Sequence, residues 1–173
     1  MPVAALIFGL LVLGLAAGGT KTGRHLVERA LGRTEHERLA MLTPDTQAFA
    51  RKLIGELAAR GIQSSLRETY RTPERQKELW EEGTRTSRSE PGWHSFGRAF
   101  HLLIVDPKTG EPDVKARRRD LYGEMHRIAR AMGGHVLGYK ELPSRTGTYT
   151  DPYHVEYRAG LTLASLRKQA GYA

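Results

Sequence analysis

Residues 93–105 read WHSFGRAFHLLIV, and this stretch carries the signals that decide the fold. Its second part, residues 98–105, is a short apolar run bounded by turn residues, which predicts a β-strand. On one continuous strand, two residues seven positions apart would point to opposite faces. Because Gly97 interrupts the regular geometry, His94 and His101 could instead converge on one ion.

Farther along the chain, residues 151–156 read DPYHVE. His154 begins a short predicted strand, 154–157, and Asp151 precedes it in a proline-containing bend, where its carboxylate could reach the same space. Three neutral imidazoles with a free carboxylate are the components of a hydrolytic zinc site: the histidines hold the metal and the carboxylate accepts a proton from water. Spacing alone leaves satisfied or exposed histidines as the alternative interpretation.

Proline, glycine and apolar spacing predict the other elements. A helix is expected to begin at Thr43-Pro44, with threonine as N-cap, and to end at Gly61. His126 falls on a charged helix, where a solvated side chain is expected. The fold class is α+β rather than a parallel α/β sheet, because helices and short strands do not alternate regularly. The remaining predictions are a strand at 63–70, a helix at 73–82, a loop at 83–92, helices at 113–132 and 161–169, and a loop before residue 154.

Composition narrows the chemistry and the partners. The chain has no cysteine, which excludes a disulfide scaffold, a thiol nucleophile and a thiolate metal site. Its 27 Lys+Arg against 19 Asp+Glu give a formal net charge of +8, so an anionic partner is expected: nucleic acid, a membrane surface or a bacterial wall. There is no phosphate-binding glycine loop, HExxH motif or glycine-flanked nucleophilic serine. The basic residues are scattered rather than interleaved with aromatic residues, so no nucleic-acid partner is expected.

Residues 1–20 contain no ionisable side chain, and residues 3–17 form an uninterrupted apolar run. As a helix this run would span about 22 Å, less than the roughly 30 Å hydrocarbon core of a membrane. We expect a membrane anchor or a cleaved signal segment; the alternative, a buried soluble helix, is disfavoured by the glycine content. Residues 21–41 are expected to form a charged helical linker. Its basic residues follow the apolar run, which favours a cytoplasmic domain and conflicts with export.

Three segments, in the right order, resemble motifs of the zinc D-Ala-D-Ala carboxypeptidases and L-alanyl-D-glutamate endopeptidases. Residues 70–79, YRTPERQKEL, are similar to their GYRS-x-x-x-Q-x-x-L motif, residues 94–101 to S-x-H-x-x-G-x-A-x-D, and residues 151–156 to D/E-x-x-H-F-E. The resemblance implies a peptidase domain at 42–173. It also implies a hedgehog/D,D-peptidase-like α+β fold, a small antiparallel sheet with flanking helices, here preceded by an apolar N-terminal helix.

Taken position by position, the resemblance implies that three histidines bind Zn²⁺: His94, His101 and His154. It implies that Asp151 is the general base, and that Arg71 binds the substrate and steadies the transition state, since its fork suits a carboxylate or a developing oxyanion. Further substrate-binding residues are expected, each with a structural alternative: Gln76 (or a helix-surface residue), Trp93 (or a packing residue beside the site) and His135 (or a core or surface residue).

Two positions depart from the family pattern. Gly92 stands where the motif has serine, and His101 stands where it has a ligand aspartate. Histidine is an ordinary zinc ligand, so a three-histidine site is compatible with metal binding. Exchanging an anion for a neutral ligand leaves one more positive charge, which would acidify bound water more strongly and hold the cation less tightly. Loss of the metal is the alternative.

The expected function is therefore a zinc-dependent metallopeptidase that cuts peptidoglycan stem peptides at L-Ala–D-Glu, as a phage endolysin or a bacterial wall-lytic enzyme. One alternative is a non-catalytic, membrane-anchored wall-binding or virion protein on the same scaffold. Another is a D-Ala-D-Ala carboxypeptidase. The expected partners are peptidoglycan and, through residues 3–17, a membrane, with a location at the membrane, in the periplasm or at the wall.

Overall fold

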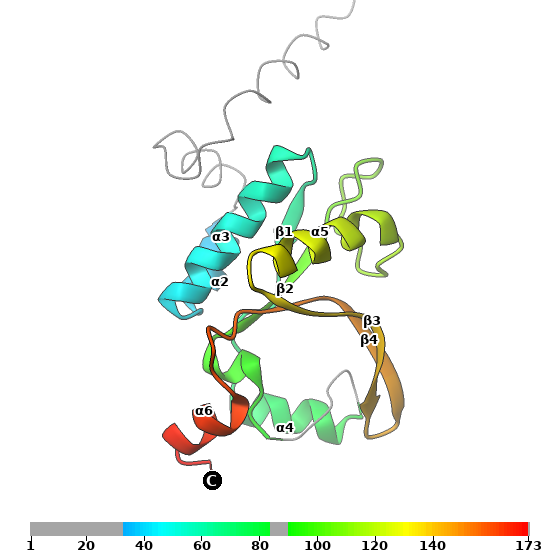
Figure 1. Ribbon diagram of the computed structural model, residues 1–173. Helices are drawn as coiled ribbons and strands as arrows, with labels where there is room; N and C mark the ends of the chain where they lie inside the picture. Colours follow the sequence, from blue (N-terminus) through cyan, green and yellow to red (C-terminus); the bar gives the residue numbers. More distant parts are fainter. Residues whose placement is uncertain (1–32, 84–89, 173) are drawn as a thin grey trace, which may run out of the picture.

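The computed structural model describes residues 33–83 and 90–172 (Figure 1). Its four strands form one antiparallel sheet in the order β1-β2-β4-β3, so the α+β prediction is confirmed. The elements in chain order are α2 (Arg33–Ala40), α3 (Pro44–Ala59), β1 (Ser64–Leu66), α4 (Pro73–Glu81), the 3₁₀ helix η2 (Trp93–Phe96), β2 (Ala99–Ile104), α5 (Arg119–Ala131), β3 (His135–Ser144), β4 (Gly147–Glu156) and α6 (Leu163–Gln169).

The predicted N-terminal apolar helix, residues 1–20, lies outside the described residues, as does the first part of the expected linker helix. The last part of that linker is α2. Among residues 33–83 and 90–172, no helix combines the length and the apolar character needed to cross a membrane.

Both proline-started helices begin where the sequence predicts. Pro44 occupies the first turn of α3 after an extended Thr43, and Pro73 occupies the first turn of α4. The Thr72 side chain accepts a hydrogen bond from the backbone N–H of Arg75 and so caps α4. A proline at this place needs no backbone donor and has the backbone angle of a helix, which sets the start of each helix.

The hydrophobic core lies between the sheet and two helices, α3 and α5 (Figure 1). On β2, Phe100, Leu102 and Ile104 point into this core and are fully buried. Side chains alternate between the two faces of a strand, so His101 points away from the core. One strand thus supports the core on one face and carries a candidate site residue on the other.

The pairing of β2 with β4 sets the register of the site. Phe100 lies opposite Val155, a pair that belongs to the core, and His101 lies directly opposite His154. Opposite residues of antiparallel strands hold their side chains on the same face at close range. The core pair therefore fixes the histidine pair, because a slip by one residue would turn every side chain to the other face.

Two element predictions were wrong. The helix expected at 113–132 begins only at Arg119, because Asp113 lies in a turn and accepts a hydrogen bond from the backbone N–H of Arg118. Instead of a loop before residue 154, the chain forms the long hairpin of β3 and β4. The glycine, proline and threonine content of this segment weakens its strand signal, and the pairing of β3 with β4 holds the two strands together.

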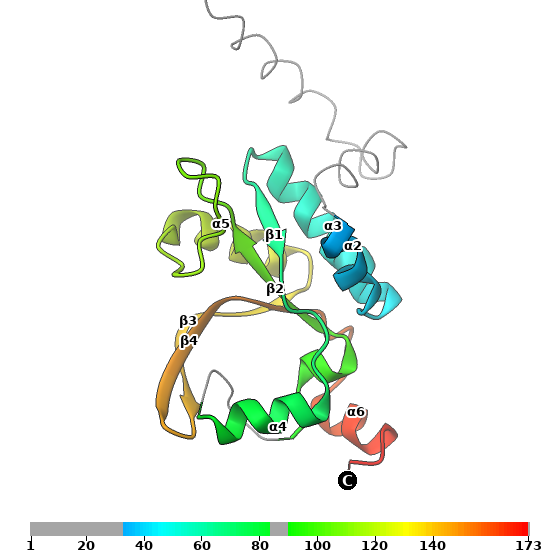
Figure 2. The same ribbon diagram turned by 180° about the vertical axis from the view of Figure 1, so that it is seen from behind.

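The far end of the β3–β4 hairpin curves toward the end of α4 (Figures 1 and 2). The guanidinium of Arg145 donates hydrogen bonds to the carbonyl oxygens of Trp80 and Glu81, and the Thr146 hydroxyl donates to the carbonyl of Gly83. These contacts provide hydrogen-bond donors to carbonyls at and just beyond the C-terminal end of α4, where the regular helical bonds end. The hairpin thus joins the sheet to α4 on the side of the molecule where the site lies.

Candidate active site

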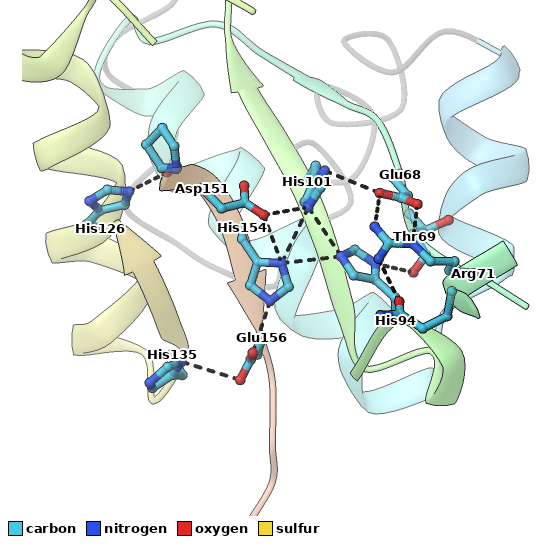
Figure 3. Close-up of polar contacts among 12 residues, drawn as sticks. Glu68, Thr69, Arg71, His94, His101, His126, His135, Asp151, His154 and Glu156 are labelled. Carbon is cyan, nitrogen blue, oxygen red and sulfur yellow. Dashed lines mark hydrogen bonds and ion pairs between the residues drawn. The ribbon is translucent and has the colours of Figure 1, made fainter. Parts of the chain in front are cut away.

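Three imidazoles meet in a tight triangle of nitrogen atoms (Figure 3). The Nε2 atom of His94 lies 3.3 Å from Nε2 of His101 and 3.3 Å from Nδ1 of His154, and the last two atoms are 3.4 Å apart. His94 comes from η2, His101 from β2 and His154 from β4. Gly97, with a φ of 63°, reverses the chain between η2 and β2 and lets the first two side chains converge.

The outer nitrogen of each imidazole faces an oxygen acceptor. Nδ1 of His94 donates to the backbone carbonyl of Thr69 at 2.9 Å, and Nε2 of His154 donates to Oε1 of Glu156 at 3.0 Å. Nδ1 of His101 lies 3.5 Å from Oε2 of Glu68. In a neutral ring, a proton on the outer nitrogen leaves the inner nitrogen with a free lone pair. All three lone pairs are then directed at one point.

This donor set fits a zinc ion. Four-coordinate tetrahedral zinc with Zn–N bonds of about 2.0–2.1 Å has edges of about 3.3–3.4 Å between ligand nitrogens. The three measured N···N separations fall in that range. Metal-bound histidines in proteins generally give their second N–H to a carboxylate or a carbonyl, as His94 and His154 do, while Nδ1 of His101 faces the Glu68 carboxylate. The described chain therefore holds a cluster that could bind a metal ion, with room for a further ligand.

Asp151 borders the same point. Its Oδ2 lies 3.3 Å from Nε2 of His101 and 3.8 Å from Nδ1 of His154. The other oxygen, Oδ1, is buried and has no hydrogen-bond partner in the described part of the chain. Burial raises the pKa of the Asp151 carboxyl, but the electrostatic influence of His101 and His154 outweighs it and lowers the pKa below its ordinary value. Asp151 is therefore an ionised acceptor at neutral pH.

The pKa shifts of His94 and Glu156 favour a cation at this centre. Burial, reinforced by the neighbouring His101 and His154, holds the pKa of His94 well below its ordinary value, so this ring is neutral at pH 7. Burial raises the pKa of Glu156, but hydrogen bonds from His154 and Arg158 bring it below the ordinary value. Glu156 is therefore a carboxylate, and because a carboxylate only accepts, His154 is the donor in their contact.

Arg71 and Gln76 lie beside the histidines and are almost fully buried. Arg71 donates from Nη1 to Oε1 of Gln76 at 2.7 Å, and its Nε and Nη2 atoms both donate to the Glu68 carboxylate. The backbone N–H of Arg71 also reaches the carbonyl of His94, at 3.4 Å. The helix-surface alternative for Gln76 does not hold, because its side chain is buried against Arg71.

A cavity of about 400 Å³ opens onto this centre. Its lining includes Arg71, Gln76, Trp93 and Asp151, together with the three histidines and apolar residues from β3, β4 and the segment before α6. Trp93 packs against Ala99 and Leu166, and the guanidinium of Arg158 lies 5.1 Å from its ring centroid. Trp93 therefore packs beside the site, as one of its two sequence interpretations has it, while it also borders the cavity.

The structure places His135 behind the site rather than in the cavity lining. Its Nδ1 lies 3.3 Å from Oε2 of Glu156 and 3.1 Å from Nη2 of Arg158, and its side chain is 44% exposed. His135 thus contacts two residues of the cavity lining, Glu156 and Arg158, of which Glu156 orients His154.

Sequence reasoning missed four residues around the site. Glu68 and Thr69 lie just before the Tyr70-Arg71 motif, and Glu156 is the last residue of DPYHVE, but no role followed from their positions alone. His126 is buried rather than solvated, and its Nε2 donates to the backbone carbonyl of Pro152, next to Asp151. The sequence offers only a weak signal for this burial, because the residues around a helical histidine do not clearly show whether it lies on the apolar or the charged side of the helix.

Comparison with known proteins places the fold. No family model matches the chain, and no curated protein matches it significantly. The chain is similar to the L-Ala D-Glu endopeptidase ChiX of Serratia marcescens, with 22% identity and a TM-score of 0.51, over 76% of this chain and 88% of that one.

Two further solved structures are similar as well. VanYB in complex with D-alanine-D-alanine has 16% identity and a TM-score of 0.51, over 75% of this chain and 78% of that one. A variant of the D,D-pentapeptidase VanY in complex with Zn(II) has 17% identity and a TM-score of 0.50, over 75% and 79%. At these identities the likeness concerns the fold, and the chain has the α+β fold of these D,D-peptidase-like structures.

Proposed function

We propose that this chain is a zinc-dependent peptidase that hydrolyses peptidoglycan stem peptides. The observation that carries the proposal is the triangle of three imidazole nitrogens beside the buried carboxylate of Asp151, at the base of a cavity. The shared fold supports the same reaction class, because the similar structures are an L-Ala D-Glu endopeptidase, a protein bound to D-alanine-D-alanine and a D,D-pentapeptidase bound to Zn(II). The net charge of +8 suits an anionic wall polymer.

His94, His101 and His154 would hold the zinc ion. A zinc ion bound there supplies Lewis acidity, which polarises a carbonyl and lowers the pKa of water. The residues around it have separate tasks: Thr69 and Glu156 orient two of the imidazoles, and the core pair Phe100–Val155 keeps the supporting strands in register. This arrangement positions the ligands before the metal arrives, which limits reorganisation on binding.

Asp151 would act as the general base. Its carboxylate accepts a proton from the attacking water as the oxygen forms a bond to the scissile carbonyl carbon. The same proton then passes to the leaving nitrogen when the C–N bond breaks, so the products are a free carboxylate and a free amine. Its lowered pKa keeps it ionised at neutral pH, and its Oδ2 atom lies beside the point at which the three imidazoles converge.

Arg71 would bind the substrate and stabilise the developing oxyanion. Its guanidinium borders the cavity and is held by Gln76 and Glu68, so its orientation is set before the substrate binds. Donors fixed in advance around the site of charge development stabilise a transition state more effectively than mobile ones.

For the scissile bond we propose L-Ala–D-Glu. Aspartate at the position of Asp151 is the commoner residue in the L-alanyl-D-glutamate endopeptidases that the sequence resembles, and ChiX shares the fold. A D-Ala-D-Ala carboxypeptidase is the second candidate, supported by the likeness to VanYB bound to D-alanine-D-alanine. The two differ in product: one splits the stem peptide after its first residue, and the other releases the terminal D-alanine.

The test uses the purified chain loaded with one equivalent of zinc and incubated with defined stem peptides, with products identified by mass spectrometry. Asp151→Asn should retain zinc and lose about 10²–10⁴-fold in kcat, the usual contribution of a general base. Asp120→Asn is the matched control, because Asp120 lies on the outer surface of α5 with a largely exposed side chain.

Each outcome is informative. Cleavage at L-Ala–D-Glu supports the endopeptidase, and release of D-alanine alone supports the carboxypeptidase. Wild-type activity in Asp151→Asn contradicts its role as the base, while loss of zinc in that variant makes Asp151 a ligand. A chain that binds wall fragments without zinc or hydrolysis is the non-catalytic alternative.

We propose that residues 1–20 tether or deliver this peptidase domain, residues 42–173, and that residues 21–41 link the two. The support is the uncharged apolar composition of that segment. A phage endolysin or a bacterial wall-lytic enzyme would use such a segment to reach the wall. Carbonate extraction of membranes from cells that produce the full chain tests this: an anchor stays with the membrane, and a cleaved signal shortens the chain.

A further inference from the structure

Glu68 is paired with His101 through the backbone. It follows β1, where the regular strand has ended, yet the backbone N–H of His101 donates to the carbonyl of Glu68 at 2.7 Å and the backbone N–H of Arg67 donates to the carbonyl of His101 at 2.8 Å. His101 thus bonds to two consecutive residues, Arg67 and Glu68, and these two bonds hold Glu68 beside it. The sheet itself therefore brings this carboxylate to the imidazole.

The Glu68 carboxylate contacts two groups of the site at once (Figure 3). Oε1 accepts from Nε of Arg71 at 2.7 Å, and Oε2 accepts from Nη2 of Arg71 and lies 3.5 Å from Nδ1 of His101. Bidentate pairing with a guanidinium fixes the plane of a carboxylate. Arg71 thus immobilises Glu68 in the position from which it contacts His101.

Among the three histidines, His101 is the one for which a neighbouring carboxylate matters most. It occupies the position where the resembling family has an aspartate, so the first coordination shell of this chain would contain three neutral imidazoles. A carboxylate on the far nitrogen of a ligand imidazole fixes its tautomer and raises its basicity. It also returns to the site the negative charge that the histidine does not carry, one ring away from the cation.

We infer that Glu68 is a positioning residue that acts through His101, so that the Glu68–His101 pair replaces a single anionic metal ligand. The same carboxylate also orients Arg71, so metal binding and substrate binding depend on one side chain. This inference rests on the proposed zinc site. It concerns how tightly the apoprotein binds the ion, which is measurable without any turnover.

The experiment measures zinc affinity of the metal-free full chain by competition with a chromophoric chelator. Glu68→Gln keeps the shape and an acceptor oxygen but removes the charge, and zinc binding should weaken about 10–100-fold. Glu78→Gln is the matched control, since Glu78 lies on α4 with a 58% exposed side chain, and its affinity should equal that of the wild type. Circular dichroism checks that both variants are folded.

A second background shows whether the effect passes through His101. In His101→Asp, the ligand carries its own charge and has no far nitrogen for Glu68 to contact. Adding Glu68→Gln to this variant should therefore change the zinc affinity by less than about twofold. If Glu68 and His101 acted independently, Glu68→Gln would instead weaken zinc binding by the same factor in both backgrounds. If Glu68→Gln does not fold, Glu68→Asp takes its place: it keeps the charge, shortens the reach to His101, and should also weaken zinc binding.

The outcomes separate the inference from the proposed function. Stoichiometric zinc in the wild type with unchanged affinity in Glu68→Gln overturns the role of Glu68 and leaves the zinc peptidase proposal intact. An equal loss in the wild-type and His101→Asp backgrounds overturns the route through His101. A wild-type chain that binds no zinc overturns the proposed metal site, and this inference with it.

Discussion

Arg71 is the residue whose surroundings constrain its role most closely. It is 8% exposed, and its guanidinium bonds to both Glu68 and Gln76. Lysine presents a single point charge and cannot bridge these two partners while facing the cavity.

We therefore predict that Arg71→Lys lowers kcat on the cleaved stem peptide by about 10²–10³-fold, the usual cost of losing an oxyanion donor. Zinc stoichiometry should stay at that of the wild type, as measured by metal analysis. Arg75→Lys, on the exposed surface of α4, is the control and should leave kcat unchanged. A kcat that Arg71→Lys does not alter would remove Arg71 from the mechanism.

His126 is buried, and its hydrogen bond to the carbonyl of Pro152 supports the strand that carries Asp151. Burial lowers the pKa of His126 below its ordinary value. In the unfolded chain the imidazole titrates near pH 6.5, so below that pH the unfolded state binds a proton that the folded state does not. The free energy of unfolding should therefore fall as the pH drops below about 6.5, by up to about 1.4 kcal/mol per pH unit for this group.

Glutamine keeps a donor for Pro152 and does not titrate. The stability advantage of the wild type over His126→Gln should thus shrink between pH 7.5 and 5.5, as measured by urea unfolding of the metal-free proteins. The other histidines are common to both chains and cancel in the difference. Parallel stability curves would show that His126 does not carry the predicted pKa shift.

At the scale of elements, the turn between η2 and β2 decides whether the first two imidazoles meet. Gly97 has a φ of 63°, and a Cβ there would lie 3.0 Å from the carbonyl oxygen of Met41 and 3.2 Å from the backbone nitrogen of Thr43. These neighbours are backbone atoms that precede α3, so they cannot move aside without shifting the helix. The close approach also holds a hydrogen bond from the Thr43 N–H to the Gly97 carbonyl.

Gly97→Ala should therefore destabilise the fold and weaken zinc binding together. Gly110→Ala is a matched control: its φ is 72°, and nothing lies within 4 Å of its Cβ position. Both variants incur the cost of a left-handed alanine, about 1–2 kcal/mol. The additional loss of stability in Gly97→Ala therefore measures the contact of the new Cβ with the backbone at Met41 and Thr43. Only this variant should lose zinc affinity. Equal behaviour of the two variants in urea unfolding and chelator competition would contradict this account.

At the scale of the whole molecule, the site joins parts of the chain that are distant in sequence. η2, β2, β4 and the segment after β1 each supply a ligand or a partner of a ligand, so an ion bound there stabilises only the folded arrangement. A ligand that binds only the native state stabilises it by about 2.7 kcal/mol at a free concentration of one hundred times its Kd.

Zinc at that excess should raise the melting temperature by several degrees, and EDTA should reverse the shift. Differential scanning calorimetry of the metal-free chain with and without zinc measures it. His94→Ala removes one ligand, so its melting temperature should not respond to zinc. A wild-type chain that melts at the same temperature in zinc and in EDTA would contradict the metal site.

The sequence by itself determined the local elements and the chemical inventory. Prolines and threonines mark the starts of α3 and α4, and the apolar run at 98–105 marks β2, because backbone geometry at these residues depends on immediate neighbours. The motifs also singled out the three histidines, Asp151 and Arg71, since the residue types and their order carry that information without coordinates.

Only the tertiary structure decided how those residues combine. The pairing of His101 with His154, the hydrogen bond of buried His126 and the contacts of Glu68 and Thr69 with the histidines join segments far apart in the chain. The β3–β4 hairpin and the contact of Glu156 with His154 are closer in sequence but depend on strand pairing as well. Such contacts depend on the strand register, which the packing of the shared core fixes. Local secondary-structure propensity does not determine this register. The ligand residues are thus readable from the chain, while the oxygens that orient them depend on the fold.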